Sequence, residues 1–138
     1  MQFWLVKTEP ETFSWQDLVS AGKTVWDGVR NYQARNYLAQ MKKGDLVLVY
    51  HSVTQKAIMG IAEVTKESYP DPTSDDPRWL AVDLVPIESF KNPIPLQWIK
   101  SQQALQNLPL IRQSRLSVMP LTTEEFHFIV SHSQNSNF

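Results

Sequence analysis

The sequence contains no cysteine, only four glycines and no apolar run of membrane-spanning length. The absence of cysteine excludes disulfide bonds, thiolate catalysis and cysteine-based zinc sites. The glycines are scattered, so no glycine-rich phosphate loop is present, and no G-x-S-x-G motif occurs either. These absences lower the expectation of an enzyme and of a membrane partner, and they fit a reducing, cytoplasmic setting.

Three histidines are present, and their positions suit no metal site. His127 and His132 lie five residues apart, whereas two ligands on one helix face need a spacing of four. His51 ends an apolar run, where a structural hydrogen bond is the ordinary role. We therefore expect no cofactor and no metal. Catalytic groups need to be close only in space, so an enzyme acting on a nucleotide or a modified base is one alternative, with Glu9, Asp27 or His51 as its candidate groups.

The charge is distributed unevenly although the net charge is −1. Residues 28–44 carry +4 and residues 89–123 carry +4, and neither segment contains an acid. Residues 63–88 carry −5. Two basic segments that meet on one face, with an acidic face elsewhere, would attract nucleic acid. A solvated surface of uneven charge is the ordinary alternative.

The residue pattern predicts an α+β domain with a mixed, mostly antiparallel sheet. Strands are expected at 3–8, 45–52, 57–65 and 78–90, with a brief extended piece at 25–26. Helices are expected at 15–20, 32–41, 95–108 (as one helix or two) and from Thr122 to about Val130, with 110–121 irregular. Pro93 and Pro95 are expected to break the chain. At least five strand pieces favour closure into a small barrel flanked by helices. We expect one domain over residues 1–131 and a flexible tail over 132–138.

Five tryptophans are many for a chain of this length. Trp4, Trp15 and Trp98 are expected in the core. Trp26 precedes a turn and Trp79 follows an acidic, proline-rich loop, so these two rings are candidates for stacking on a base. Core burial is the alternative for each.

Arginine and asparagine gather where the helix at 32–41 should begin. Arg30, Asn31, Arg35 and Asn36 bracket a helix N-terminus, whose free N–H groups favour anions. Arginine donates two hydrogen bonds to a phosphate, and an asparagine amide can pair with a base edge. The segment RQSRLS at 112–117 repeats the theme with two arginines and two serines. Helix capping and ordinary surface polarity are the alternatives.

Five ordered segments of the chain resemble the EVE domain family. They are FWLVKTEP (3–10), WDGVRNYQARN (26–36), GDLVLVYHS (44–52), DPRWLAVDL (76–84) and RQSRLSVMPL (112–121). The resemblance extends from Phe3 to about Ile129. It implies a PUA-like fold, which is a small pseudo-barrel of mixed strands with flanking helices, similar to YTH and ASCH domains. It also implies a stand-alone bacterial protein that binds a modified base, of the modified-cytosine class and flipped out of DNA or RNA, without catalysis.

The resemblance and the residue types together predict one pocket built from three segments. The base pocket is expected to include Trp26, Asn31, Tyr50, His51, Ser52, Trp79, Ser114 and Ser117. Phosphate and other polar contacts are expected from Lys7, Arg30, Arg35, Asn36, Arg112 and Arg115, and the four arginines should share a face. The expected partner is DNA or RNA carrying a modified base. A small-ligand or protein-interaction module of the same fold is a further alternative.

Overall fold

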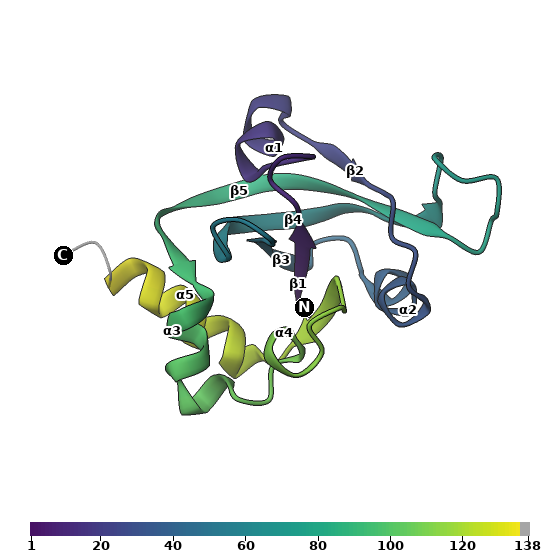
Figure 1. Cartoon of the computed structure of the whole chain (residues 1–138). Coiled ribbons are helices and arrows are strands. Elements are labelled where there is room, and N and C mark those ends of the chain that lie inside the picture. The colour runs from purple at the N-terminus through teal and green to yellow at the C-terminus, as the bar shows by residue number, and fades with distance from the viewer. Residues whose placement is uncertain (136–138) are drawn as a thin grey trace.

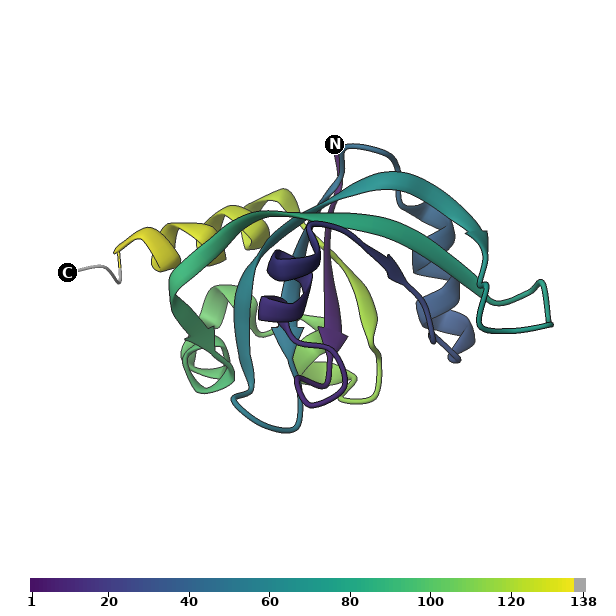
Figure 2. The ribbon, with the colours of Figure 1, turned by 90° about the horizontal axis from the view of Figure 1, so that it is seen from above.

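One curved, six-stranded sheet forms the centre of the fold, in a computed structural model that describes residues 1–135 (Figure 1, Figure 2). The strands are β1 (Phe3–Thr8), β2 (Thr24–Trp26), β3 (Leu46–His51), β4 (Ala57–Pro70), β5 (Leu80–Pro95) and β6 (Val118–Leu121), and they lie in the order β2-β5-β4-β3-β1-β6. The pair β1–β3 is parallel, and the other four pairs are antiparallel. The α+β class and the mixed, mostly antiparallel sheet are therefore confirmed.

Side-chain caps mark the starts of some of the helices, whereas others begin without one. The helices are α1 (Trp15–Ala21), α2 (Tyr32–Gln40), α3 (Leu96–Ser101), α4 (Pro109–Arg112), α5 (Thr123–Asn135) and the 3₁₀ helix η1 (Gln103–Leu105). The Ser14 hydroxyl accepts from the Asp17 N–H at 3.0 Å, and the Thr122 hydroxyl accepts from the Glu125 N–H at 3.0 Å. Both are capping boxes, as the sequence predicts, because Asp17 and Glu125 accept from the N–H groups of Ser14 and Thr122 in return.

The expectation that Pro93 breaks the chain is wrong, because β5 continues to Pro95. β4 also continues beyond its expected end, to Pro70. At the far end of β5, Ile94 pairs with Ile58 of β4, whereas β2 covers only residues 82–84 on the other side. A proline lacks the N–H that a neighbouring strand needs, so it fits a strand stretch with one open edge. The segment 110–121 likewise contains more order than expected, in α4 and β6.

The sheet does not close into a barrel, contrary to the expectation from the number of strands. β2 pairs with β5, and β6 pairs with β1, so these two short strands are the open edges of the sheet. With three and four residues, they offer few backbone groups for a further ladder. Helix α2 packs against both β5, the neighbour of β2, and the edge strand β6 (Figure 2).

Two of the three predicted core tryptophans are buried and hydrogen-bonded. Trp4 donates its indole N–H to the buried Asp45 carboxylate at 3.0 Å, and Trp15 donates to the Ser89 hydroxyl at 2.8 Å. A buried indole N–H without a partner would be costly, so these bonds stabilise both positions.

Trp98 is half-buried and joins α3 to the C-terminal helix. Its ring stacks on His132 of α5, with 3.7 Å between the ring centroids. Helix α5 therefore continues past Val130 to Asn135, into the segment 132–138 that was expected to be a flexible tail. The rest of that segment, residues 136–138, lies outside the described residues.

Candidate nucleic-acid interface

A cavity of about 360 Å³ lies between the two edge strands, where the sheet stays open. We call it the Trp26 cavity. β1 contributes Lys7, β2 contributes Trp26, and Ser117 comes from the residue before β6. Phe13 forms another wall, and its ring meets that of Trp26 edge to face with 6.1 Å between centroids. The cavity thus combines two aromatic rings with an ammonium and a hydroxyl group.

Trp26 is both a core residue and a cavity wall. Its exposed fraction is 7%, so the core alternative for this ring is correct as far as burial goes. It nevertheless lines the Trp26 cavity together with Asp27, Gly28 and Arg30. The chain turns there because Gly28 has φ +78°, a conformation that L side chains rarely adopt. Asn31 then caps α2 by accepting from the Ala34 N–H at 2.9 Å.

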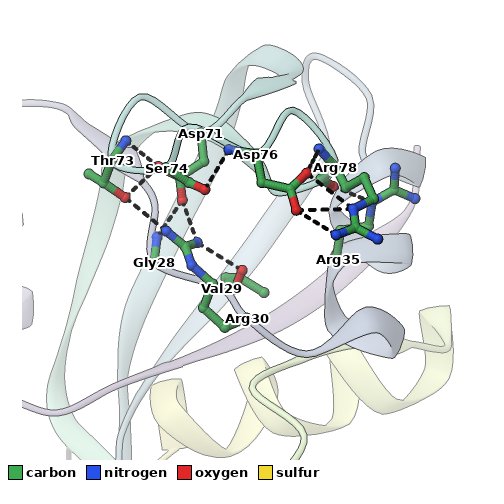
Figure 3. Close-up of polar contacts among 9 residues, drawn as sticks. All are labelled: Gly28, Val29, Arg30, Arg35, Asp71, Thr73, Ser74, Asp76 and Arg78. Carbon is green, nitrogen blue, oxygen red and sulfur yellow. Dashed lines mark hydrogen bonds and ion pairs between the residues drawn. The ribbon is translucent and has the colours of Figure 1, made fainter.

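The turn after Trp26 is fastened to the acidic loop by Asp71 (Figure 3). We call this arrangement the Asp71 clamp. Asp71 accepts hydrogen bonds from the Gly28 N–H at 2.8 Å, from Arg30 Nη1 at 2.8 Å, and from the N–H and hydroxyl of Thr73 at 2.7 and 2.6 Å. Burial alone would raise the pKa of Asp71. The hydrogen bonds from Arg30, Thr73 and Gly28 outweigh burial and hold that pKa well below its usual value.

The contacts of Arg30 and Arg35 differ from those expected from the sequence. Arg30 is paired with the Asp71 carboxylate, so its charge is largely balanced within the protein. Arg35 donates from Nε to the Arg78 carbonyl at 2.7 Å and from Nη1 to the Asn36 amide oxygen at 2.9 Å. The acidic segment therefore lies against the first basic segment and does not form a separate face (Figure 3).

Trp79 does not line the Trp26 cavity. Its ring lies 4.9 Å from that of Tyr32, and the Arg30 guanidinium lies over it at 5.7 Å from the centroid. The half-exposed Tyr32 completes this aromatic cluster on the outer side of the clamp. The two tryptophans singled out in the sequence thus have different surroundings.

The second basic segment meets the start of α2 at a separate hollow. This hollow of about 310 Å³ is lined by Asn31 together with Arg112, Ser114 and Arg115. Arg112 donates from Nε to the Gln106 carbonyl at 2.8 Å, and the Arg115 side chain is exposed. The structure therefore brings the RQSRLS segment to Asn31, whereas Arg30 and Arg35 contact the acidic loop.

Lys7 lies between the Trp26 cavity and a second hollow of about 320 Å³, and it lines both. We call the second one the lysine hollow, because Lys56 and Lys100 line it as well. The Lys7 ammonium donates to the Ser114 carbonyl at 2.9 Å, and burial lowers the pKa of Lys7. The two spaces therefore adjoin at Lys7.

Two residues of the YHS segment also line the lysine hollow. Tyr50 is buried, and burial raises the pKa of its phenol. The Ser52 hydroxyl donates to the Thr8 carbonyl at 3.3 Å. These two predicted pocket residues therefore lie next to the Trp26 cavity and outside its lining.

His51 has a structural position away from the Trp26 cavity. Its Nε2 accepts from the Trp15 N–H at 2.9 Å, so the ring proton lies on Nδ1, which faces the Gln55 amide oxygen. This bond holds the start of α1 against the end of β3. The ordinary structural role considered for His51 is the one that the geometry supports.

Two acids at the site were missed as binding residues in the sequence. Asp27 lines the Trp26 cavity, and its pKa is raised by burial and by the Asp71 charge, against the opposing effects of its backbone hydrogen bond and Arg30. Asp71 carried one local signal, since Asp-x-Thr in a proline-rich loop is typical of a side-chain-capped turn. Nothing local indicated its pairing with Arg30. Within residues 1–135, no cluster of three or more metal-ligating side chains occurs, and no helix is long and apolar enough to cross a membrane.

Comparisons with known proteins agree on one family. Residues 2–132 match the family model described as EVE domain. Thymocyte nuclear protein 1 of Mus musculus is 40% identical over an alignment of 163 positions, which covers 94% of this chain and 72% of that protein.

Solved structures give the same result. A protein from Pseudomonas syringae has a TM-score of 0.90 at 43% identity, covering 95% of this chain and 99% of its own. The crystal structure of human THYN1 protein in complex with 5-methylcytosine containing DNA has a TM-score of 0.89 at 39% identity, covering 96% and 98%. An ASCH protein from Zymomonas mobilis, at 17% identity and a TM-score of 0.62, shares the fold alone.

Proposed function

The chain belongs to the EVE domain family, and from this premise we propose that it binds nucleic acid carrying a modified base, with modified cytosine favoured, and catalyses no reaction. The observation that carries the proposal is the Trp26 cavity between the open edges of the sheet. The relative crystallised with 5-methylcytosine containing DNA supports the choice of base.

The Trp26 cavity offers what an extruded base requires. Such a base leaves its stack and needs a ring to lie against, polar groups at its edge and cations near its phosphates. In our proposal Trp26 and Phe13 supply the ring contacts, and Lys7 supplies the cation. Asp27 is the one acid in the described lining of this cavity. A carboxylate accepts well from the amino group of cytosine, which gives Asp27 a role in favouring that base.

The size of the preference for a methyl group follows from burial. Burying one methyl group contributes about 0.8 kcal/mol, which is roughly a fourfold change in affinity at about 1.4 kcal/mol per tenfold. A larger preference requires that the cavity also exclude the unmodified base by shape or by a hydrogen bond. We therefore expect at least about fourfold preference for 5-methylcytosine over cytosine.

Calorimetric binding at one salt concentration tests the proposal. The probes are one oligonucleotide with cytosine and the same one with 5-methylcytosine, each as DNA and as RNA. Wild type should prefer the modified strand, Trp26→Phe should reduce that preference, and Trp79→Phe should leave it unchanged as the matched control. Equal affinities for the two bases, or an effect confined to Trp79→Phe, would overturn the assignment.

The same mixtures of protein and oligonucleotide distinguish this function from the two alternative classes. An enzyme acting on the base would release or alter it, so recovery of the unchanged oligonucleotide after long incubation supports a reader. If phosphates are contacted, the affinity for the oligonucleotide should fall steeply as the salt concentration rises. A small-ligand or protein-interaction module should show no such fall.

Our proposal also includes the cellular location of the protein and the boundaries of its folded domain. We place the protein in the cytoplasm of a bacterial cell, which cell fractionation would check. We take residues 1–131, completed by the rest of α5, as one folding unit. A single cooperative transition in urea is expected, and two transitions would contradict it.

A further inference from the structure

The loop between β3 and β4 has an unusual backbone. Within residues 1–135, the non-glycine residues with positive φ are Val53 at 68°, Gln55 at 67° and Lys56 at 44°, all in this one loop. A positive φ is a genuine outlier for a β-branched residue such as valine. Strained residues of this kind persist only where their surroundings hold them, and they gather at functional sites.

This loop, residues 52–56, is held rigidly at both ends. The Ser52 N–H donates to the Thr8 carbonyl at 2.9 Å, and the Leu96 N–H donates to the Lys56 carbonyl at 2.8 Å. Inside the loop, the N–H groups of Thr54 and Lys56 each donate to the carbonyl two residues earlier at 2.8 Å. The result is a stiff tip whose apolar Val53 side chain is 66% exposed.

Val53 borders a cationic hollow that shares the lining residue Lys7 with the Trp26 cavity. It lines the lysine hollow together with Lys7, Lys56 and Lys100, and none of the described residues that line this hollow is acidic. Lys7 also lines the Trp26 cavity. If a nucleic-acid strand places a base in that cavity, the lysines offer positive charge to the neighbouring phosphates. Val53 then offers an apolar tip for the position in the stack that the base has left.

We propose that the 52–56 loop is a wedge for a base-paired target: Val53 enters the stack where the nucleotide has left, while Lys56 and Lys100 bind the flanking phosphates. This inference rests on the proposed function and deepens it, because it makes a duplex the substrate. Proteins that unstack a duplex commonly insert an apolar side chain at the step that opens. The stiff loop keeps Val53 from folding back onto the protein surface, and the lysines position the strand without reading its sequence.

The main test compares Val53→Ala with Val19→Ala, which truncates an exposed valine on α1. The probes are a duplex with 5-methylcytosine paired to guanine and the modified strand alone. Val53→Ala should weaken duplex binding roughly fifteenfold, since it removes two methyl groups at about fourfold each. On the single strand, which has no duplex stack to open, the loss should stay below about twofold. Val19→Ala should match wild type on both.

A second arm tests the lysine hollow. Lys56→Gln and Lys100→Gln should each lower the slope of log affinity against log salt by about 0.9 on the duplex, the contribution of one phosphate contact. Lys43→Gln, which lies before β3 and so toward the other end of that strand from the loop, should leave the slope unchanged.

The outcomes separate this inference from the proposed function. If wild type prefers the modified strand but Val53→Ala loses nothing, or loses equally on duplex and single strand, the wedge is wrong and the proposed function stands. Unchanged salt slopes for both lysine variants would show that the flanking phosphates do not bind in the lysine hollow. If wild type shows no preference for the modified base in either form, the proposed function fails, and the wedge fails with it. Urea midpoints of all variants establish that each one is folded.

Discussion

Variants that break the Asp71 clamp test whether Arg30 supports the Trp26 cavity or binds a phosphate. The two variants are Arg30→Met and Asp71→Asn, measured singly and together. The Asp71 side chain has no exposed area, whereas that of Arg30 is 40% exposed, and their charged atoms lie 2.8 Å apart. Without Arg30, Asp71 still accepts from Gly28 and Thr73. The buried carboxylate would therefore lose one of its four hydrogen bonds.

The expected magnitudes follow from these contacts. A hydrogen bond to a charged group contributes about 1.5–3 kcal/mol, and solvent around the exposed part of Arg30 reduces its share. We expect Arg30→Met to lower the free energy of unfolding by about 1–2 kcal/mol. Asp71→Asn should lower it by about 3 kcal/mol, because the amide would bring an NH₂ donor into a buried site whose other groups are also donors. The double variant should cost about 1 kcal/mol less than the sum, since the two residues share an interaction.

Urea unfolding measures these costs, and oligonucleotide binding at several salt concentrations measures the effect on function. The clamp holds the turn after Trp26, so both single variants should weaken binding to the modified strand. Arg30→Met should not change the salt slope, because Arg30 is already neutralised by Asp71. Arg115→Met is the matched control: its side chain is exposed in the second basic segment, and its loss should lower the slope by about 0.9.

One pattern of results would refute this reasoning. If Arg30→Met lowers the salt slope like Arg115→Met while Asp71→Asn binds as wild type does, Arg30 contacts a phosphate, as the sequence alone predicts. The clamp would then be dispensable for the cavity.

Three further predictions concern burial and ionisation. Trp26→Ala should abolish the preference for a modified base and lower the free energy of unfolding by about 3–5 kcal/mol, because the ring is buried as well as in the cavity wall; a loss under about 1 kcal/mol in urea would contradict that placement. Asp71 has a folded-state pKa below its unfolded value near 3.9, so its stabilisation is present above that value and is lost as the pH falls through the folded pKa. The stability difference between wild type and Asp71→Asn should therefore stay constant from pH 7 to about 5 and shrink below about pH 4 in urea melts, and a difference that shrinks already near pH 6 would be inconsistent with this shift. Gly60→Ala should cost at least about 2 kcal/mol by the same assay, because a Cβ there collides with the Trp15 ring and the Glu88 carbonyl; an unchanged midpoint would show that β4 and α1 can separate freely.

The sequence by itself determined the features that depend on neighbours a few residues away. The capping residues Ser14, Asn31 and Thr122 mark the starts of α1, α2 and α5, because a cap bonds only to the N–H groups of the next turn. The apolar runs predicted β1 and β3, since strands inside a sheet are buried on both faces. The ordered motifs identified the family, which the family model confirms.

Only the tertiary structure decided which polar residues are free and which are paired. Arg30 and Arg115 have the same local character in the sequence, yet Arg30 meets Asp71, 41 residues away. Trp26 and Trp79 both lie beside turns, yet one lines the cavity and the other packs against Tyr32 with the ring planes tilted. Such pairings depend on which strands become neighbours, and the two short edge strands that leave the cavity open are themselves a consequence of the whole sheet. Local periodicity determines an element and its buried face, whereas the charge and shape of the site arise where elements distant in the chain meet.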